Sequence, residues 1–300
     1  MGVVGGKIIF CEGKKASSEH ERDSLDYLLL DRVVENLSGD KPTIVPVGGK
    51  FNFSLFAQGF FFPDQVDSQK CIVFRDRDFD ICPTEDIKLL EIINIRSKVI
   101  SLSTHRTCVE NYLLDANLIH EYWNVKYAEK QENPSSKWGH GESPGIDILT
   151  DWIESSAMNL QEYQAIRWAL GDLLNMSQAR TQLKTTWTGG SGTLPLSFTL
   201  DDCRTEARNL INQFRQGVTF VTEEAFESSL LEYHNQFSKS EFWSNKNYLI
   251  WFHGKDLQKM MQKQKSHYIS LKNFFDWAVT RLDITAYPDL MELRTKIEQL

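Results

Sequence analysis

The chain has 300 residues, of which 41% are hydrophobic and 25% are charged, and its formal net charge is −8. This composition is typical of a soluble globular protein with enough length for about two domains. No apolar run approaches the roughly 18 residues of a membrane span, so we expect no membrane interaction. The negative net charge excludes a surface that attracts nucleic acid everywhere, because phosphate binding depends on clustered Lys and Arg.

The cysteines predict reduced thiols rather than disulfides or a zinc site. The five cysteines are an odd number without a CxxC pair, and three of them lie in or beside apolar, strand-like runs. Such buried thiols are typical of a reducing compartment. The N-terminal sequence MGVVGGKIIFCEG is too short and too quickly acidic for a secretory signal. We therefore expect a cytoplasmic protein.

The first third of the chain alternates short apolar runs with helical patterns. The apolar runs are rich in Ile and Val and have the length of buried strands; they are residues 7–11, 43–47, 71–74 and 98–102. Helical patterns fall between them, at residues 26–39, 51–60 and 84–97. Ser24 is the expected N-cap of the first helix, and Gly39 is its expected end. This alternation predicts a parallel sheet with flanking helices.

The remainder of the chain predicts a loop and then helices. Residues 130–145 are rich in polar residues, Gly and Pro, which indicates a linker or a mobile loop. Apolar residues then recur at helical spacing in four segments, at 147–174, 201–217, 223–237 and 270–282, and a Gly-rich loop is expected at 186–197. We therefore predict an α/β domain at 1–125, a linker or mobile loop at 126–145 and a mainly α-helical domain at 146–300.

Acidic residues follow the predicted strands, at the point where each strand ends. Asp76 and Asp78 come after the third strand, and alternate positions of a strand share a face. The carboxyl ends of parallel strands are where ligands gather in open α/β sheets. Two carboxylates there repel each other, and Mg²⁺ relieves that repulsion because it prefers oxygen ligands. The alternative interpretation is a solvated acidic turn.

Two further acids favour the metal site over the solvated turn. Glu12 follows the first strand and precedes Gly13, and Glu110 follows the fourth strand at the start of a helix. Each acid alone has an ordinary explanation, as a strand-end charge or as a helix-start residue favoured by the helix dipole. Acids at three strand ends of one parallel sheet, however, lie on one rim. The sequence thus predicts an acidic rim that binds a divalent cation.

Four short sequences together resemble a known family. FCEG, PVGGKFN, VFRDRDFD and VENYLLD occur in this order within the first 120 residues. This set resembles a Toprim domain and is most similar to the Toprim nucleases of the overcoming-lysogenisation-defect type. Within that group it is similar to the effectors that are paired with an ABC-type ATPase in PARIS-type bacterial phage defence. The resemblance covers residues 7–120; beyond them only FHGKDL, near Lys255, matches.

The resemblance implies roles for the acidic residues. Glu12 would hold a metal ion or shuttle a proton, Asp76 and Asp78 would be metal ligands, and Glu110 would match the EN element of the family. Such nucleases usually carry another acid shortly after the first glutamate. This chain has Ala at position 16 instead, so Asp26, at the start of the next helix, is the assigned metal ligand. The alternative for that position is Asp23.

The resemblance also implies how phosphate is bound. Lys255 would face the scissile phosphate, although an exposed lysine more often solvates a surface. Gly48, Gly49 and Lys50 follow the second strand, and their backbone N–H groups and the lysine charge would hold a phosphate. The alternative for this glycine pair is a plain turn. Residues 254–272 carry five Lys against one Asp, which makes this segment the candidate local patch for a polyanion.

These features predict phosphodiester cleavage with one or two Mg²⁺ ions, or with Mn²⁺ as the alternative ion. The resemblance favours RNA, transfer RNA in particular, over DNA as the substrate. It implies a toxic anti-phage effector that an ABC-type ATPase partner holds inactive, and a possible homodimer in the active state. The rival interpretations are a DNA-nicking Toprim nuclease, a primase-like or topoisomerase-like protein, and a non-catalytic metal-binding interaction module.

The remaining aromatic and histidine residues receive mainly structural interpretations. Trp138 and Trp187 lie in Gly-rich loops, where they would either stack on unpaired bases or pack beneath the loop. His105, His140 and His253 have no partner at metal-ligand spacing in the sequence. We therefore interpret these histidines as structural or surface residues.

Overall fold

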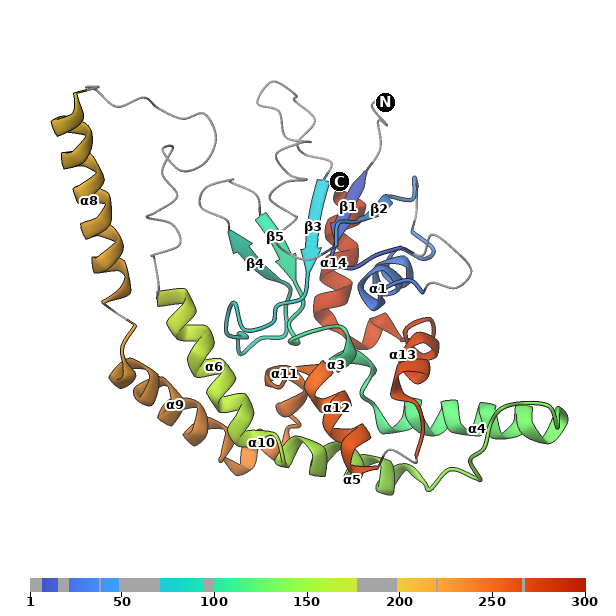
Figure 1. The fold of residues 1–300 in the computed structure, drawn as a ribbon. Helices are drawn as coiled ribbons and strands as arrows, with labels where there is room; N and C mark the ends of the chain where they lie inside the picture. The colour runs from blue at the N-terminus through green and yellow to red at the C-terminus, as the bar shows by residue number, and fades with distance from the viewer. Residues whose placement is uncertain are drawn as a thin grey trace. The chain divides into compact units, whose positions relative to one another are not determined.

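The fold is that of a computed structural model, which describes residues 7–15, 22–37, 39–48, 71–93, 100–176, 199–219, 221–265 and 268–300. The chain divides into two compact units (Figure 1). The first unit comprises Met1–Leu160 together with Ser244–Leu300, and the second comprises Gln161–Trp243.

The first unit is built on a mainly parallel sheet. Five strands of the described residues pair in the order β2-β1-β3-β5-β4. The four strands expected from the sequence run parallel, and the additional strand β4 pairs antiparallel with β5. The bounds are β1 Ile8–Cys11, β2 Thr43–Pro46, β3 Cys71–Arg75, β4 Leu90–Ile93 and β5 Ile100–Ser103. The predicted α/β class with flanking helices is confirmed at this level.

The strand β4 replaces part of a predicted helix. Residues 84–97 have apolar residues at a spacing that predicts a helix, yet Leu90–Ile93 forms a strand and residues 84–89 are not helical. In the register, Leu90 lies opposite Ser103 of β5. A short apolar run that contains adjacent β-branched residues suits an edge strand as well as a helix, so tertiary pairing decides between them.

The first crossover helix largely follows the sequence. Helix α1 spans Leu25–Val33, and the Ser24 hydroxyl accepts a hydrogen bond from the Tyr27 backbone N–H at 3.4 Å, so the predicted N-cap is confirmed. The helix ends at Val33, well before the predicted end at Gly39. Gly39 instead has a φ of +100° in the turn that leads to β2. The predicted helix at 51–60 lies outside the described residues.

Further helices lie in the described part of the first unit. They are α3 Glu110–Leu113, α4 Ala116–Glu132, α5 Ile146–Met158, α11 Tyr248–Trp251, α12 Gly254–Gln264, α13 Leu271–Val279 and α14 Pro288–Gln299, with a 3₁₀ turn η3 at Ile284–Ala286. Among the described residues, no helix combines the length and the apolar character that a bilayer crossing requires.

The C-terminal residues return to the sheet. Helix α14 lies beside it (Figure 1), and the Glu292 carboxylate accepts a hydrogen bond from the Leu89 backbone N–H at 2.9 Å. Residues 244–300 consequently group with the sheet, as do residues 126–160. This division does not follow the boundaries that the sequence analysis set at 125 and 145, because the helical pattern of the C-terminal segments does not reveal what they pack against.

The predicted linker is partly helical and is anchored to the unit. Helix α4 continues to Glu132, and the loop after it is held by a hydrogen bond from the Trp123 indole N–H to the Gly141 carbonyl at 2.8 Å. Trp138 lies edge-on to the rings of Tyr122 and Trp123. Trp138 therefore packs beneath its loop, as in the second of its two interpretations. Trp187 lies outside the described residues.

The second unit is helical in its described part. It contains α6 Gln161–Met176, α8 Leu200–Val218 and α9 Glu223–Phe237, and α10 Ser240–Ser244 leads out of it in sequence. The predicted helix 147–174 is two helices, because the chain turns at residues 159 and 160. Helices α6 and α9 pack together, with Trp168 buried against Tyr233 at a ring distance of 5.5 Å. The predicted loop at 186–197 lies outside the described residues.

Candidate metal centre

The strand register brings the predicted acids to one edge of the sheet. Cys11, the last residue of β1, pairs with Phe74 of β3, so Glu12 and Asp76 leave the sheet at the same edge. Strand β5 ends at that edge as well, because Arg75 pairs with Ser103. The loop after β5 leads directly to Glu110 in the first turn of α3. The rim predicted from the sequence is therefore formed at the carboxyl ends of these strands.

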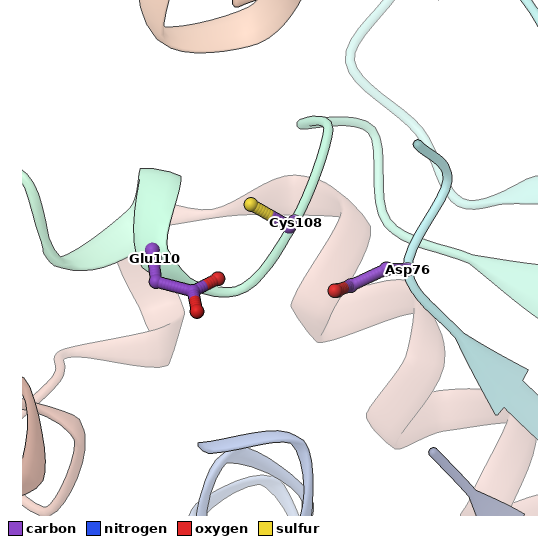
Figure 2. Close-up of side chains that lie close together, drawn as sticks. All are labelled: Asp76, Cys108 and Glu110. Atoms are coloured by element: carbon purple, nitrogen blue, oxygen red, sulfur yellow. The ribbon is translucent and has the colours of Figure 1, made fainter. Parts of the chain in front are cut away.

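Three side chains at this edge lie close enough to share one ion. Asp76, Cys108 and Glu110 each offer a ligand atom, and these atoms all lie within 4.8 Å of one another. Figure 2 shows Asp76 at the end of β3 and the other two on the segment that enters α3. The residues are buried, since Asp76 is 2% exposed and Glu110 is 7% exposed. Glu12, Asp26 and Asp78 are not members of this group.

Cys108 is a residue of the centre that the sequence analysis missed. Burial raises the pKa of its thiol well above the ordinary value, and the nearby Glu110 and Asp76 carboxylates raise it further. The thiol lies 3.1 Å from the Asn111 side-chain oxygen, to which it donates. Cys108 therefore remains a neutral thiol that lines the centre, and the oxygen atoms that a hard cation prefers belong to the carboxylates. Its position two residues before Glu110 was the available signal.

The Lys255 ammonium lies between the two carboxylates. Its Nζ is 3.4 Å from Asp76 Oδ2 and 3.9 Å from Glu110 Oε1. Burial acts to lower the pKa of Lys255, but Asp76 and Glu110 outweigh it and the pKa is raised, so the side chain stays charged. The side chain is nevertheless 47% exposed. The Lys255 side chain therefore extends from the acidic centre to the protein surface.

Asp26 adds a further carboxylate next to this group. Burial raises its pKa to about 6; the Lys255 charge lowers the pKa, whereas the Glu110 charge raises it. The Oδ1 atom of Asp26 is buried and has no hydrogen-bond partner among the described residues. A buried carboxylate oxygen that has no donor and lies among other carboxylates fits a cation ligand. Of the two candidates that the sequence left open, Asp26 is the one whose charge raises the pKa of Asp76, and its role as a ligand stays a prediction.

The pKa of Asp76 is raised by the same causes, which are burial and neighbouring carboxylates. Burial raises its pKa well above the ordinary value, and the Asp26 charge raises it further, whereas the Lys255 charge lowers it. Its Oδ1 accepts a hydrogen bond from the Val109 backbone N–H at 3.1 Å. Several carboxylates in one buried place are unfavourable without additional positive charge. A divalent cation would supply that charge, so the residues present fit such an ion.

Glu12 directly follows the last residue of β1, and Asp26 lies in the first turn of α1. Burial raises the pKa of the Cys11 thiol to about 12, and the charges of Asp26 and Glu12 contribute to the increase. Gly13, which follows, has a φ of +86°, and a Cβ there would lie 2.1 Å from the Ser24 hydroxyl. Only glycine therefore allows the chain to pass the start of α1 so closely. This close approach brings the segment after β1 against the start of α1, which carries Asp26.

Asp78 lies in the turn after β3 and not in the strand, so the alternation predicted for a strand does not apply to it, although its charge still raises the pKa of Asp76. Strand β3 ends at Arg75, and Asp78 has a φ of +52° in the turn that follows. Its carboxylate lies 3.1 Å from His253 Nε2. The strand periodicity fails because the backbone leaves the extended conformation before the second aspartate. The third aspartate, Asp80, forms an ion pair with Arg75 at 2.6 Å.

His253, which the sequence analysis interpreted as a structural or surface residue, caps a helix and contacts Asp78. Its Nδ1 accepts a hydrogen bond from the Lys255 backbone N–H at 3.3 Å and so caps helix α12. This bond leaves the proton on Nε2, which donates to Asp78. The ring also stacks on Phe79, with 5.8 Å between centroids. One histidine therefore positions both Asp78 and the helix that carries Lys255.

Close packing joins the Glu110 segment to the Lys255 segment. The Asn111 side chain donates to the Phe252 carbonyl at 2.9 Å and accepts from the Gly254 backbone N–H at 3.0 Å. A Cβ at position 254 would lie 2.7 Å from the Asn111 side-chain oxygen. Glycine is thus required before Lys255 because the two segments touch here. This contact explains why the distant motifs VENY and FHGK meet.

The buried Arg77 joins the same segments from the other side. Its guanidinium donates to the Ile250 carbonyl at 2.6 Å, to the Ile81 carbonyl at 2.7 Å and to the Thr107 hydroxyl at 3.4 Å. Burial lowers its pKa to about 10, so it remains charged at neutral pH. Arg77 therefore fixes the turn after β3 against the loop before α3 and the residues before α12.

The predicted phosphate loop is only partly described. Gly48 has a φ of +83°, and its backbone N–H donates to the Gly13 carbonyl at 2.9 Å. This amide is therefore engaged with the protein and unavailable to a phosphate, as in the plain-turn interpretation. Gly49 and Lys50 lie outside the described residues, so their part in phosphate binding stays a prediction.

Comparison with known proteins adds no assignment to this geometry. No protein-family model matches the chain, and a search of curated proteins finds no significant match.

Proposed function

We propose that the protein is a metal-dependent endonuclease of the Toprim type that hydrolyses phosphodiester bonds in RNA, transfer RNA in particular. One observation carries the proposal. The buried carboxylates of Asp76 and Glu110 converge at the carboxyl edge of a mainly parallel sheet, with the Lys255 ammonium 3.4 Å and 3.9 Å from them. Acids that hold a cation and a lysine that faces the surface are the groups that phosphodiester hydrolysis requires.

Asp76 and Glu110 would hold the ion, with Asp26, Glu12 and Asp78 at the same edge available to complete its shell. Mg²⁺ is the expected ion because all of these ligands are carboxylates, and Mn²⁺ is the alternative. When bound, the metal orients the phosphate, activates water and neutralises charge on the leaving oxygen. Asp76 and Asp26, whose pKa values are raised by burial and by neighbouring carboxylates, would be relieved of that repulsion by a bound cation.

Lys255 would act on the substrate rather than on the ion. Its side chain extends from the acidic centre to the surface and remains charged. An ammonium at this position can bind a non-bridging oxygen of the phosphate and stabilise the negative charge that grows in the transition state. His253 would keep the lysine in place, because it caps the helix on which Lys255 lies.

The biological setting of the proposal follows from the sequence resemblance over residues 7–120. It is a cytoplasmic anti-phage effector that is toxic when active and is held inactive by an ABC-type ATPase partner. A homodimer in the active state belongs to the same proposal. The observed α/β sheet is compatible with a Toprim domain, and the specific Toprim assignment rests on the motifs.

The second candidate is a non-catalytic module in which the acids have a structural role. One observation favours it: Asp76 has two partners, the Val109 backbone N–H and the Lys255 ammonium. A closed ion-pair network of this kind can stabilise the joint between two segments without any reaction. Measurement of cleavage separates the two candidates.

The test is incubation of purified protein with Mg²⁺ and either total cellular RNA or plasmid DNA, with EDTA as the control. The proposal predicts products from RNA in Mg²⁺, no products in EDTA and loss of products with Asp76→Asn. Asp80→Asn is the matched control, because Asp80 follows the same strand but pairs with Arg75. Cleavage of DNA alone would favour the DNA-nicking alternative, and no cleavage of either would favour the non-catalytic module.

Lys255→Met sharpens the distinction between the two candidates. If Lys255 acts on the phosphate, this variant loses cleavage but still gains thermal stability from Mg²⁺, because both carboxylates remain. If the lysine is only a structural partner of Asp76, the variant is destabilised in the absence of metal and any cleavage persists. Thermal unfolding with and without Mg²⁺ measures the first quantity, and cleavage of RNA measures the second.

A further inference from the structure

Helix α12 carries a row of lysines that begins at the metal centre. Lys255, Lys259 and Lys263 are spaced by four residues, so their side chains lie along one face of the helix. The opposite face is fixed by packing, since Leu257 and Met261 are buried. The orientation of the lysine row is therefore set by the core and not by the lysines themselves.

The outer two lysines are positioned to meet a ligand. Lys259 and Lys263 are both exposed, and neither makes an ion pair within the described part of the chain. The helix as a whole has three lysines and one acid, Asp256. This local positive charge contrasts with the formal net charge of −8 for the entire chain. An exposed basic row on an acidic protein is typical of a surface that selects a polyanion locally.

The row of lysines starts at the acidic centre and follows helix α12 away from it. Lys255 Nζ is 3.4 Å from Asp76 Oδ2, so the first lysine lies at the acidic centre. A helix rises about 1.5 Å per residue, which places Lys263 about 12 Å further along the axis than Lys255. Figure 1 shows α12 starting beside α3, which carries Glu110. The row therefore leads from the acids outward over the surface.

The negative charge of the acidic centre opposes the binding of nucleic acid, so a positively charged surface beside the centre would favour binding. The carboxylates of the centre repel the phosphates of any nucleic acid that approaches, and a bound divalent ion offsets only part of that charge. Lysines on the flanking helix provide attraction outside the centre, where water and salt compete but no metal is required. A row on one helix suits a continuous phosphate backbone rather than a single small anion.

We propose that Lys259 and Lys263 bind successive backbone phosphates of the RNA strand on one side of the bond that Lys255 faces. This inference rests on the proposed function, because it takes Lys255 as the marker of the scissile phosphate. The occupant is the substrate RNA, recognised by its charge and not by its bases, since lysine contacts to phosphate position a strand without reading its sequence.

The test is a binding measurement in EDTA, so that no cleavage occurs. A labelled single-stranded RNA is titrated with wild-type protein and with Lys259→Ala/Lys263→Ala over a range of salt concentrations, and binding is followed by fluorescence anisotropy. Each phosphate contact contributes about 0.7 to the slope of log affinity against log salt for single strands, so the double variant should lower the magnitude of that slope by about 1.4. Lys259→Arg/Lys263→Arg should restore the slope.

The matched control is Lys88→Ala/Lys137→Ala, which removes the same charge from two exposed lysines outside α12. The inference is overturned if the control lowers the slope as much as the α12 variant, or if the α12 variant leaves the slope unchanged. It is also overturned if a DNA strand of the same sequence binds more tightly than the RNA.

Failure of this inference can be distinguished from failure of the proposed function. Suppose that wild-type protein cleaves RNA in Mg²⁺ while the α12 variant keeps both the KM and the salt slope of the wild type. In that case the inference about Lys259 and Lys263 is wrong, and the proposed nuclease activity is retained. If no cleavage occurs but the salt slope of RNA binding depends on Lys259 and Lys263, the proposed nuclease activity is wrong and the RNA-binding role of the two lysines is retained. Thermal unfolding checks that the variants are folded.

Discussion

Two buried aspartates of the first unit have almost equal exposure but opposite surroundings. Asp76 is 2% exposed and Asp289 is 1% exposed. Asp289, at the start of α14, accepts hydrogen bonds from the His105 backbone N–H at 2.9 Å and from the Tyr112 hydroxyl. Both donors are neutral groups of the protein, so this aspartate anchors the C-terminal helix to the loop before α3.

Asp76, in contrast, lies among other carboxylates. Burial and the Asp26 charge raise its pKa, and the Lys255 ammonium only partly compensates. The comparison shows that burial of an acid does not by itself indicate a functional site. Crowding of like charges in a place that a cation can reach does, because such an arrangement costs stability unless an ion binds.

Among the substitutions that test this comparison of Asp76 with Asp289, Asp76→Asn is expected to have the largest effect. The substitution should lower RNA cleavage by about 100- to 1,000-fold, because it removes a carboxylate that holds the cation. It should also increase the stability of the metal-free protein, since the neutral amide relieves the repulsion from Asp26. Single-turnover cleavage and urea denaturation in EDTA measure the two effects. A variant that is both active and less stable would contradict the assignment.

Asp289→Ala should lower the stability of the protein, whereas Asp76→Asn should raise it in the absence of metal. Loss of the carboxylate leaves the His105 N–H and the Tyr112 hydroxyl without their acceptor in the interior, at a cost of about 2–4 kcal/mol in unfolding free energy. The increase in melting temperature on addition of Mg²⁺ should be unchanged, because Asp289 holds no ion. If Mg²⁺ no longer stabilised this variant, the distinction between the two aspartates would be lost.

The pH dependence of stability gives a third measurement. The pKa of Asp26 is raised from 3.8 to about 6, so the folded state binds more protons than the unfolded state between these values. The free energy of unfolding of the metal-free protein should therefore fall as pH rises from about 4 to about 6, by at most about 3 kcal/mol from this group.

Mg²⁺ should reverse that trend, because the metal binds the deprotonated carboxylates. Its stabilising effect should grow from pH 5 to pH 7, as Asp26 loses its proton. Denaturant titrations at several pH values, with Mg²⁺ or EDTA, measure both trends. Asp26→Asn should flatten them, and Asp23→Asn is the control, since Asp23 was the alternative assignment. An equal response to Mg²⁺ at pH 5 and pH 7 would count against Asp26 as a ligand.

His253→Asn should have the smallest effect of the four. Asparagine is a good N-cap, so helix α12 and the stability of the protein should be preserved. The shorter side chain cannot reach Asp78, so cleavage should decrease by about 10- to 100-fold, as is typical for residues that orient a metal site. Comparison with His253→Ala, which loses both roles, separates capping from positioning. Full activity of the asparagine variant would show that the Asp78 contact is dispensable.

The local sequence pattern was sufficient for much of the fold. The four parallel strands, the Ser24 cap and the bounds of helix α9 follow the periodicity of the residues. The errors occurred where a pattern suits two structures. Residues 90–93 have an apolar run that a helix or a strand can use, and pairing with β5 selected the strand. Asp78 does not follow the strand alternation, because β3 ends at Arg75 and Asp78 lies in the turn that follows.

By itself, the sequence determined that acids leave a mainly parallel sheet at one edge, because strand direction and residue order establish this. Only the tertiary structure decided which side chains meet there. Lys255 and His253 come from the other end of the chain, and their arrival depends on the close contact between Asn111 and Gly254 and on the hydrogen bonds of the buried Arg77. Such contacts depend on packing between distant segments, which periodicity along the chain does not encode.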